Sequence, residues 1–211
     1  MITRSILAHA SRTVDTPTAI TIGLHAFDAD HAQGLALASA LGDSVAAHAP
    51  VSPRPVSPRF AEGSKSLDGR LWFFEREGYV EPSLFGDSLR QLEAFLCDTI
   101  DRHDDADRVP LVLVGRGQGG VLALVLAMAW PELVDVTVTI DATLPAVPGW
   151  TLPESDLGGR VVHLLTTRPE SDGDRATETT LRRAGADVRL RSVEEANLTD
   201  ELARIGTDLL T

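Results

Sequence analysis

The sequence contains few of the residues that form cross-links or cationic surfaces. Cys97 is the only cysteine and Lys65 the only lysine among 211 residues. A single cysteine excludes an internal disulfide, which favours a reducing, cytoplasmic setting. The formal net charge of −12 argues against nucleic acid or an anionic membrane surface as a partner.

Long apolar runs are also missing. No stretch approaches the roughly 20 apolar residues that cross a bilayer, and residues 1–5 (MITRS) do not begin a signal peptide. We therefore expect no membrane span. Hydrophobic residues nevertheless make up 43% of the chain, and the length suits one compact domain covering residues 1–211.

The most informative stretch is residues 109–124, VPLVLVGRGQGGVLAL. Its short apolar run lies between a proline and a glycine, which predicts a strand buried on both faces of a parallel sheet. An Ala/Leu-rich segment follows at once and predicts a helix. The corner Gly-Arg-Gly-Gln-Gly has the spacing of a nucleophile elbow, G-x-S-x-G, but Gly117 stands at the position of the serine.

Strand and helix patterns alternate along the whole chain. Apolar runs predict strands at residues 5–12, 19–25, 44–48, 109–114, 133–140, 160–166 and 187–192. Helices are predicted at residues 32–41, 83–103, 118–130, 174–184 and 198–210, with Cys97 packed in the core, whereas residues 57–80 and 141–157 are expected to be irregular. This alternation implies an α/β fold, with a mostly parallel, doubly wound sheet and helices on both faces.

Four features occur together and in order. They are Leu24-His25 at a strand end, the aromatic run 70–73 (RLWF), the corner 114–120 (VGRGQGG), and a late succession of strand, acid, helix, strand and helix. In this combination the chain resembles the carboxylesterase/phospholipase branch of the α/β-hydrolases, which includes acyl-protein thioesterases and bacterial predicted esterases. The resemblance covers nearly the whole chain. It implies an α/β-hydrolase fold without a cap domain, and a homodimer is a further expectation.

The resemblance also implies a catalytic triad, in which a histidine activates a serine and a carboxylate orients the histidine. Gly117 occupies the serine position, and Ala196 falls where the histidine belongs. Glu170 aligns with the acid better than Asp172 does. A lone serine-to-glycine change is also what an engineered inactive enzyme carries, but the second loss favours natural degeneration of the triad.

Two backbone N–H groups remain at the corner. Those of Gln118 and Phe27 match the family's oxyanion donors, and the former lies at a helix N-terminus, which favours a carbonyl oxygen or an anion. Ala26 and Asp28 replace family glycines next to Phe27, and the carboxylate of Asp28 disfavours an anionic ligand. Glycine at position 117 fits either close approach of a ligand or the positive φ of an elbow.

Two charged or titratable side chains near the corner each have two interpretations. Arg116 either binds a ligand carboxylate or forms a structural pair with an acid such as Glu170. His25 either acts as an acid/base or holds the oxyanion loop through hydrogen bonds.

Aromatic side chains on the two irregular segments are candidates for an apolar pocket. Trp72, Phe73 and Trp150 would line it, although Trp72 and Phe73 are equally suited to packing their loop onto the sheet. Neither a metal-ligand pattern nor a dinucleotide-binding pattern is present, so we expect no metal and no cofactor.

Three functions are compatible with this sequence. The favoured one is a non-hydrolytic pseudohydrolase that binds a small, mostly apolar ligand with a carbonyl or acid group over Gly117 and Gln118. The second is an enzyme of altered chemistry, such as a lyase, isomerase or cyclase, with His25, Asp28 or Glu170 as acid/base. The third is a weak carboxylic-ester hydrolase that uses an activated water. Fold alone does not separate them.

Overall fold

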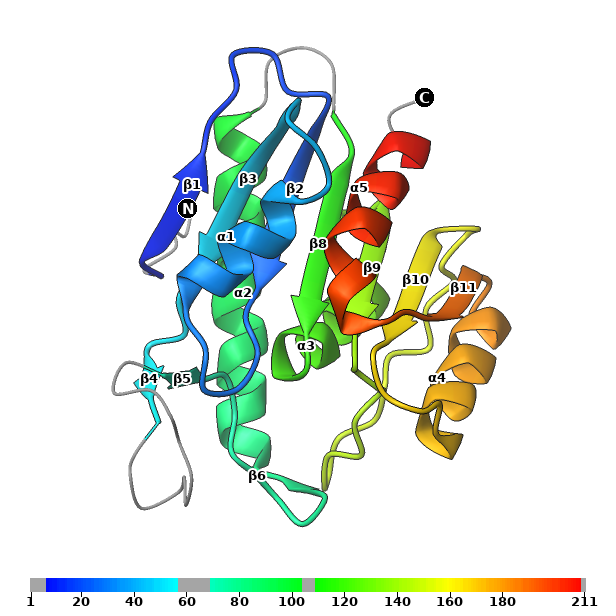
Figure 1. The fold of residues 1–211 in the computed structure, drawn as a ribbon. Coiled ribbons are helices and arrows are strands. Elements are labelled where there is room, and N and C mark those ends of the chain that lie inside the picture. Colours follow the sequence, from blue (N-terminus) through cyan, green and yellow to red (C-terminus); the bar gives the residue numbers. More distant parts are fainter. Residues whose placement is uncertain (1–6, 57–68, 104–108, 210–211) are drawn as a thin grey trace.

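A central sheet organises the structure, a computed structural model that describes residues 7–56, 69–103 and 109–209 (Figure 1). The sheet has seven strands in the spatial order β1-β3-β2-β8-β9-β10-β11. These strands are β1 (His9–Arg12), β2 (Ala19–Leu24), β3 (Val45–Pro50), β8 (Leu111–Arg116), β9 (Val136–Ile140), β10 (Val161–Thr166) and β11 (Asp187–Ser192). The helices are α1 (His31–Ser39), α2 (Pro82–Arg102), α3 (Gln118–Ala129), α4 (Asp172–Arg183) and α5 (Leu198–Leu209), with a 3₁₀ turn η1 (Glu195–Asn197) before α5.

The strand directions confirm the predicted sheet. Only β1 runs antiparallel, against β3, while all other neighbouring pairs of this sheet are parallel. Parallel strands need crossover connections, and helices supply them for most pairs. The carboxyl ends of the parallel strands therefore meet at one edge of the sheet, where β8 turns into α3.

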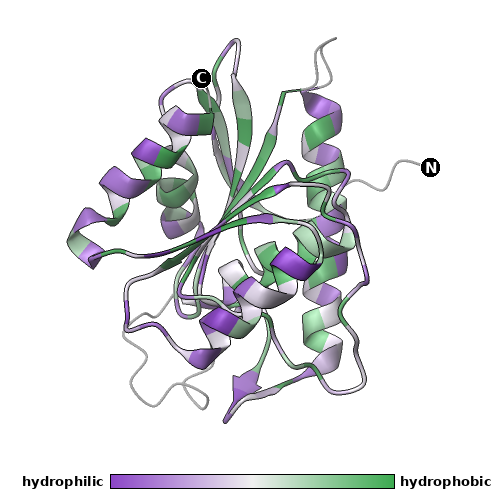
Figure 2. Ribbon diagram, turned by 90° about the vertical axis from the view of Figure 1, so that its right-hand side faces the viewer, coloured by the Kyte–Doolittle hydropathy of each residue, from purple (hydrophilic) through white to green (hydrophobic). Residues whose placement is uncertain are grey.

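Helices cover both faces of the sheet, as predicted. Buried residues of α1 and α5 pack with β8 and β9 on one face, whereas those of α2 and α3 pack with β2 and β8 on the other. Helix α4 joins α3 on that second face, against β10 and β11. Figure 2 shows hydrophobic residues on the central strands and hydrophilic residues on the outer helices.

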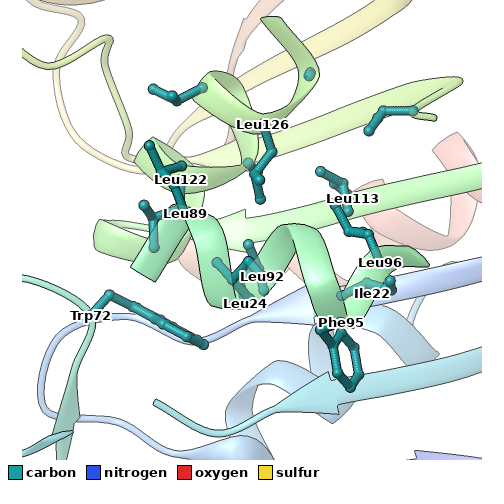
Figure 3. Packing of buried hydrophobic residues seen from close by; sticks show 14 of the residues in the cluster. Ile22, Leu24, Trp72, Leu89, Leu92, Phe95, Leu96, Leu113, Leu122 and Leu126 are labelled. Atoms are coloured by element: carbon teal, nitrogen blue, oxygen red, sulfur yellow. The ribbon is translucent and has the colours of Figure 1, made fainter. Parts of the chain in front are cut away.

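The periodic apolar positions of α2 explain how it is held on the sheet. One stripe of this helix faces inward and meets β2 and β8 (Figure 3). The buried side chains in this contact are Ile22, Leu24, Leu89, Leu92, Phe95, Leu96 and Leu113. Burial of each such side chain stabilises the fold by about 1.5–3 kcal/mol before the entropy cost.

Several predicted boundaries need correction. The strand predicted at 133–140 begins at Val136, because the residues before it form a turn in which the Leu133 N–H donates to Trp130 O at 3.0 Å. Helix α4 begins at Asp172 rather than at residue 174, because Ser171 caps it. Of the strand predicted at 5–12, only residues 9–12 form β1, and residues 5 and 6 lie outside the described ranges. Cys97 is exposed, so its placement in the core was wrong.

The segment predicted to be irregular at 57–80 is partly ordered into short strands, and its residues 57–68 lie outside the described ranges. Two small two-stranded sheets form here, β4 (Arg54–Pro55) with β5 (Arg70–Leu71), and β6 (Glu75–Arg76) with β7 (Tyr79–Val80). Among the described helices, none is long and apolar enough to cross a membrane.

His163 predicts how the stability of the fold depends on pH. Its side chain is buried in β10, and both ring nitrogens lack a hydrogen-bond partner in the described structure. Burial, aided by Arg189 and Arg191, lowers its pKa to about 4. An unfolded chain takes up this proton near pH 6.5, so the folded state loses stability as the pH falls from about 6.5 towards 4.

We expect His163→Leu to weaken this dependence. The melting temperature of the native chain should fall between pH 7 and pH 5, above the range in which most carboxylates titrate. The fall should be smaller in the variant, because His163 no longer contributes. Some fall should remain, because buried His25 and His48 also have lowered pKa values. Equal falls in the two proteins would contradict the assignment.

Candidate functional site

The corner between β8 and α3 has the backbone of a nucleophile elbow. Gly117 has φ 51° and ψ −120°, and its N–H donates to Ile140 O at 2.9 Å. A Cβ atom built on Gly117 would meet only the Cβ of Ala26, at 3.6 Å, which is an ordinary contact. The structure therefore retains the strained turn and leaves space where a serine side chain would lie.

The neighbouring glycines have a different role. A Cβ on Gly119 would lie 2.2 Å from Leu24 O, and one on Gly115 would lie 2.4 Å from Gly119 O. Both distances are far below contact, and the obstructing atoms belong to the backbone. These two glycines let α3 start directly against the end of β2, which brings the two sides of the corner together.

Gln118 connects the elbow to the aromatic segment. Its N–H lies in the first turn of α3, where no intrahelical acceptor is available, so it can bind a ligand oxygen. Its side-chain Oε1 accepts from the N–H of Trp72 at 3.1 Å, and its Nε2 donates to Phe73 O at 2.9 Å. The side chain thus holds the segment directly after β5 against the start of α3.

Hydrogen bonds engage both ring nitrogens of His25. Nδ1 donates to Ala26 O at 2.8 Å, and Nε2 accepts from the N–H of Ser52 at 3.3 Å. Trp72 stacks on the ring with centroids 4.7 Å apart, and its Nε1 donates to His25 O at 2.9 Å. Burial lowers the pKa of His25. With both nitrogens engaged, the geometry favours the holding role over acid/base chemistry.

The loop after β2 is fixed by a side chain that the sequence did not single out. Gln33, on α1, accepts a hydrogen bond from the N–H of Ala26 at 2.7 Å. Phe27 follows with 44% of its surface exposed. Asp28 adopts φ 59°, and its N–H donates to Arg70 O at 3.0 Å. Asp28 thus adopts a positive φ, which favours glycine, at a position where the resemblance places a glycine.

The aromatic residues predicted to line a pocket divide into two groups. Trp72 and Phe73 are fully buried, which favours the alternative that they pack their segment onto the sheet. Phe73 packs against Phe85 with centroids 5.1 Å apart, and Trp150 packs on the same Phe85 at 5.4 Å. Trp150 remains 38% exposed. Of the three predicted aromatic residues, Trp150 alone presents ring surface. Phe27, on the loop after β2, presents ring surface as well.

Arg116 is paired, but with a different acid from the one proposed. Its Nη1 and Nη2 donate to the two carboxylate oxygens of Glu195 at 2.6 and 2.7 Å. Asp141, which accepts from the N–H and hydroxyl of Thr167 at 2.7 Å each, lies 3.5 Å from the same guanidinium. The hydrogen bonds from Arg116 lower the pKa of Glu195.

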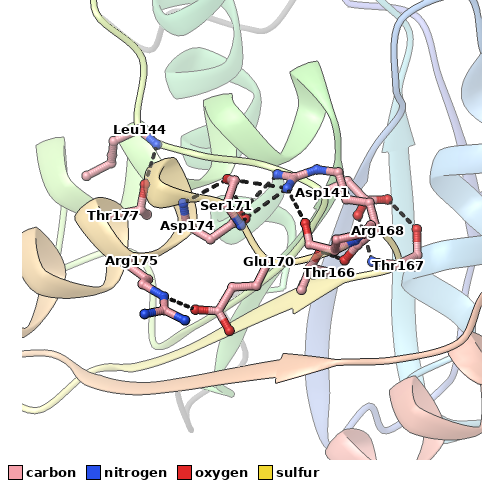
Figure 4. Close-up of polar contacts among 11 residues, drawn as sticks. Asp141, Leu144, Thr166, Thr167, Arg168, Glu170, Ser171, Asp174, Arg175 and Thr177 are labelled. Carbon is pink, nitrogen blue, oxygen red and sulfur yellow. Dashed lines mark hydrogen bonds and ion pairs between the residues drawn. The ribbon is translucent and has the colours of Figure 1, made fainter.

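The two outer triad positions lie in different surroundings. Ala196 is exposed in η1, directly after Glu195, so the ion pair with Arg116 ties this turn to the elbow. Glu170 instead pairs with Arg175 at 2.7 Å and lies on the surface at the start of α4 (Figure 4). Within the described ranges, Glu170 has no contact with the elbow.

A buried carboxylate near Glu170 was also missed. Asp174 is 4% exposed, accepts from both Nη atoms of Arg168 at 2.8 and 3.0 Å, and forms a capping box with Ser171. Burial alone raises its pKa, but the hydrogen bonds from Arg168 and Ser171 outweigh this effect and lower it. The pattern Ser-x-x-Asp could have predicted this cap. No group of three metal-ligating side chains lies together in the described structure.

The overall geometry can be compared with known proteins. The sequence matches no family model and no curated protein. Among solved structures, the carboxylesterase of Bacillus cereus has a TM-score of 0.73 at 16% identity, over 97% of this chain and 95% of that chain. The chain has the α/β-hydrolase fold.

Other α/β-hydrolases are similarly close. Acyl-protein thioesterase 2 of Zea mays has a TM-score of 0.69 at 14% identity, over 97% of this chain and 99% of that chain. YahD, solved with malic acid, has a TM-score of 0.73 at 12% identity, over 97% of this chain and 100% of that chain. No helix is inserted in the described residues between β9 and β10, consistent with an α/β-hydrolase that has no cap.

Proposed function

We propose that this chain is a carboxylesterase/phospholipase-like homologue that binds a small ligand at the elbow without hydrolysing it. The observation that carries the proposal is Gly117, which keeps the elbow conformation and has no side chain. Ester hydrolysis in this fold needs a nucleophile and a base. Gly117 and Ala196, which occupy those two positions, can supply neither. Binding and oxyanion stabilisation are what remain.

The ligand is a small, mostly apolar molecule with a carbonyl group. Its oxygen would accept hydrogen bonds from the N–H groups of Gln118 and Phe27, and the space above Gly117 admits an atom where a serine oxygen would otherwise lie. Phe27 and Trp150 offer exposed apolar surface. The carboxylate of Asp28 and the engagement of Arg116 with Glu195 favour a neutral carbonyl over a carboxylate.

An esterase assay with restored side chains tests this function. The native chain should not react with a fluorophosphonate probe and should not hydrolyse p-nitrophenyl butyrate. Gly117→Ser should gain little, because a serine without a base is a weak nucleophile. Gly117→Ser with Ala196→His should exceed the single variant by about a hundredfold, the contribution of a general base.

Gly117→Ala is the matched control, since it adds a Cβ and no nucleophile. Covalent labelling of the native chain would overturn the proposal and favour a weak hydrolase. The homodimer is a separate expectation, which sedimentation velocity of the native chain checks.

A further inference from the structure

We propose a second ligand site, remote from the elbow, that binds a free α-amino acid with an apolar side chain. A surface pocket of about 580 Å³, open to solvent, lies between α3, α4 and the loop that leads into β10. This volume is in the range of small-molecule sites. The crossover from β9 to β10 contains no helix among its described residues, and its residues 152–156 line the pocket on one side.

The cavity is far from the elbow. Met128, which lines it, comes eleven residues after Gly117 on α3, which corresponds to about 16 Å along the helix. Arg183, on the opposite wall, is the last residue of α4. The site is therefore independent of the ligand proposed for Gly117 and Gln118.

The loop that covers the cavity is held in place by backbone hydrogen bonds. The N–H of Leu157 donates to Ala184 O at 2.7 Å, and the N–H of Gly159 donates to Gly185 O at 2.9 Å. Asp156 accepts from the N–H of Gly158 at 2.9 Å. These bonds join the loop to the end of α4, so the cavity wall is a built part of the fold.

Arg183 is unusual among the arginines of the described residues. It has no hydrogen bond or ion pair there, although the chain has 31 acidic residues against 19 basic ones. Arg183 is exposed at the C-terminus of α4, where the helix dipole attracts a basic residue, and its guanidinium has no acceptor among the described residues. A carboxylate in the cavity would provide one, with two oxygens that match the guanidinium.

Two acids share the cavity with Arg183. Glu154, which is unpaired in the described structure, and Asp156 both line it. They would repel a simple carboxylate, and Arg183 would repel a simple cation. A ligand that carries an ammonium beside a carboxylate satisfies both kinds of charge, and buried Met128 with Leu152 offers apolar surface to its side chain.

A set of three probes tests this site on the full chain by ¹⁵N NMR titration. L-Leucine carries both charges, N-acetyl-L-leucine lacks the cation, and L-leucinamide lacks the anion. L-Leucine should shift the amides of Leu152 and Gly185 saturably, and each of the other two should bind at least about tenfold more weakly, the loss expected for one charged hydrogen-bond partner.

Variants assign the binding to Arg183. Arg183→Gln should weaken leucine binding about tenfold, whereas Arg175→Gln, the same change at an exposed position of α4, should leave it unchanged. Absence of saturable shifts with leucine, or equal binding of leucinamide, would overturn the proposal. Equal binding by Arg183→Gln would do the same. Gly117→Ser should not affect leucine binding, so this test and the esterase test fail independently.

Discussion

Gly119→Ala is expected to unfold the chain or leave it only marginally stable, whereas Gly117→Ala, two residues earlier, leaves it folded. The Cβ at position 119 would lie 2.2 Å from Leu24 O and 2.6 Å from His25 O, so β2 and α3 would have to separate. Backbone atoms at the end of β2 cannot move aside as a flexible side chain can. We expect a loss of about 4 kcal/mol or more, a large part of the stability of a typical domain.

The cost at Gly117 has a different origin and is smaller. The added Cβ meets only Ala26 at 3.6 Å, so the penalty is conformational and comes from φ 51°. A non-glycine residue in such a region costs about 1–3 kcal/mol. Urea denaturation of the two variants measures the difference. Equal stability of both would contradict the close approach of α3 to β2.

Asp174→Ala is expected to lower the free energy of unfolding by about 3 kcal/mol, mostly through lost charge-assisted hydrogen bonds and partly through the lost half of the capping box. Asp174 accepts from both Nη atoms of Arg168 and from the N–H and hydroxyl of Ser171 at 2.8 and 2.7 Å (Figure 4). Its removal takes the carboxylate away from Arg168 and removes the reciprocal half of the capping box, while Ser171 still accepts from the N–H of residue 174.

Glu170→Ala is the matched control for that change. Glu170 lies four residues earlier and pairs with exposed Arg175, and such surface pairs stabilise little. The free energy of unfolding, measured by urea denaturation at pH 7, should therefore stay close to that of the native chain. A larger loss of stability in Glu170→Ala than in Asp174→Ala would contradict the conclusion that Asp174, and not Glu170, stabilises the start of α4.

The sheet and the elbow could be predicted because their signals are local. The apolar run of β8, the dense glycines and the Ala/Leu-rich helix adjoin in sequence, and each has a steric reason to be there. The positive φ of Gly117 follows from the elbow spacing alone. The stripe of leucines along α2 likewise follows from a single helical period.

The partners of the site could not be predicted, because they depend on contacts between distant parts of the chain. Arg116 and Glu195 are 79 residues apart, and nothing near either residue indicates the other. Trp72 and Phe73 lie in a segment without periodicity, so sequence left pocket and core equally open. Their burial depends on Gln118, whose side chain binds the backbone of both.

The most direct test of the central claim is a ¹⁵N NMR titration of the native chain with hexanamide, a neutral carbonyl ligand that cannot be hydrolysed readily. Saturable shifts should appear at the amides of Gln118 and Phe27, and malate should produce weaker ones because of Asp28. Amides of α5 should not change. If the amides of Gln118 and Phe27 do not shift while the chain stays folded, the elbow does not bind a carbonyl ligand and the proposed function is contradicted.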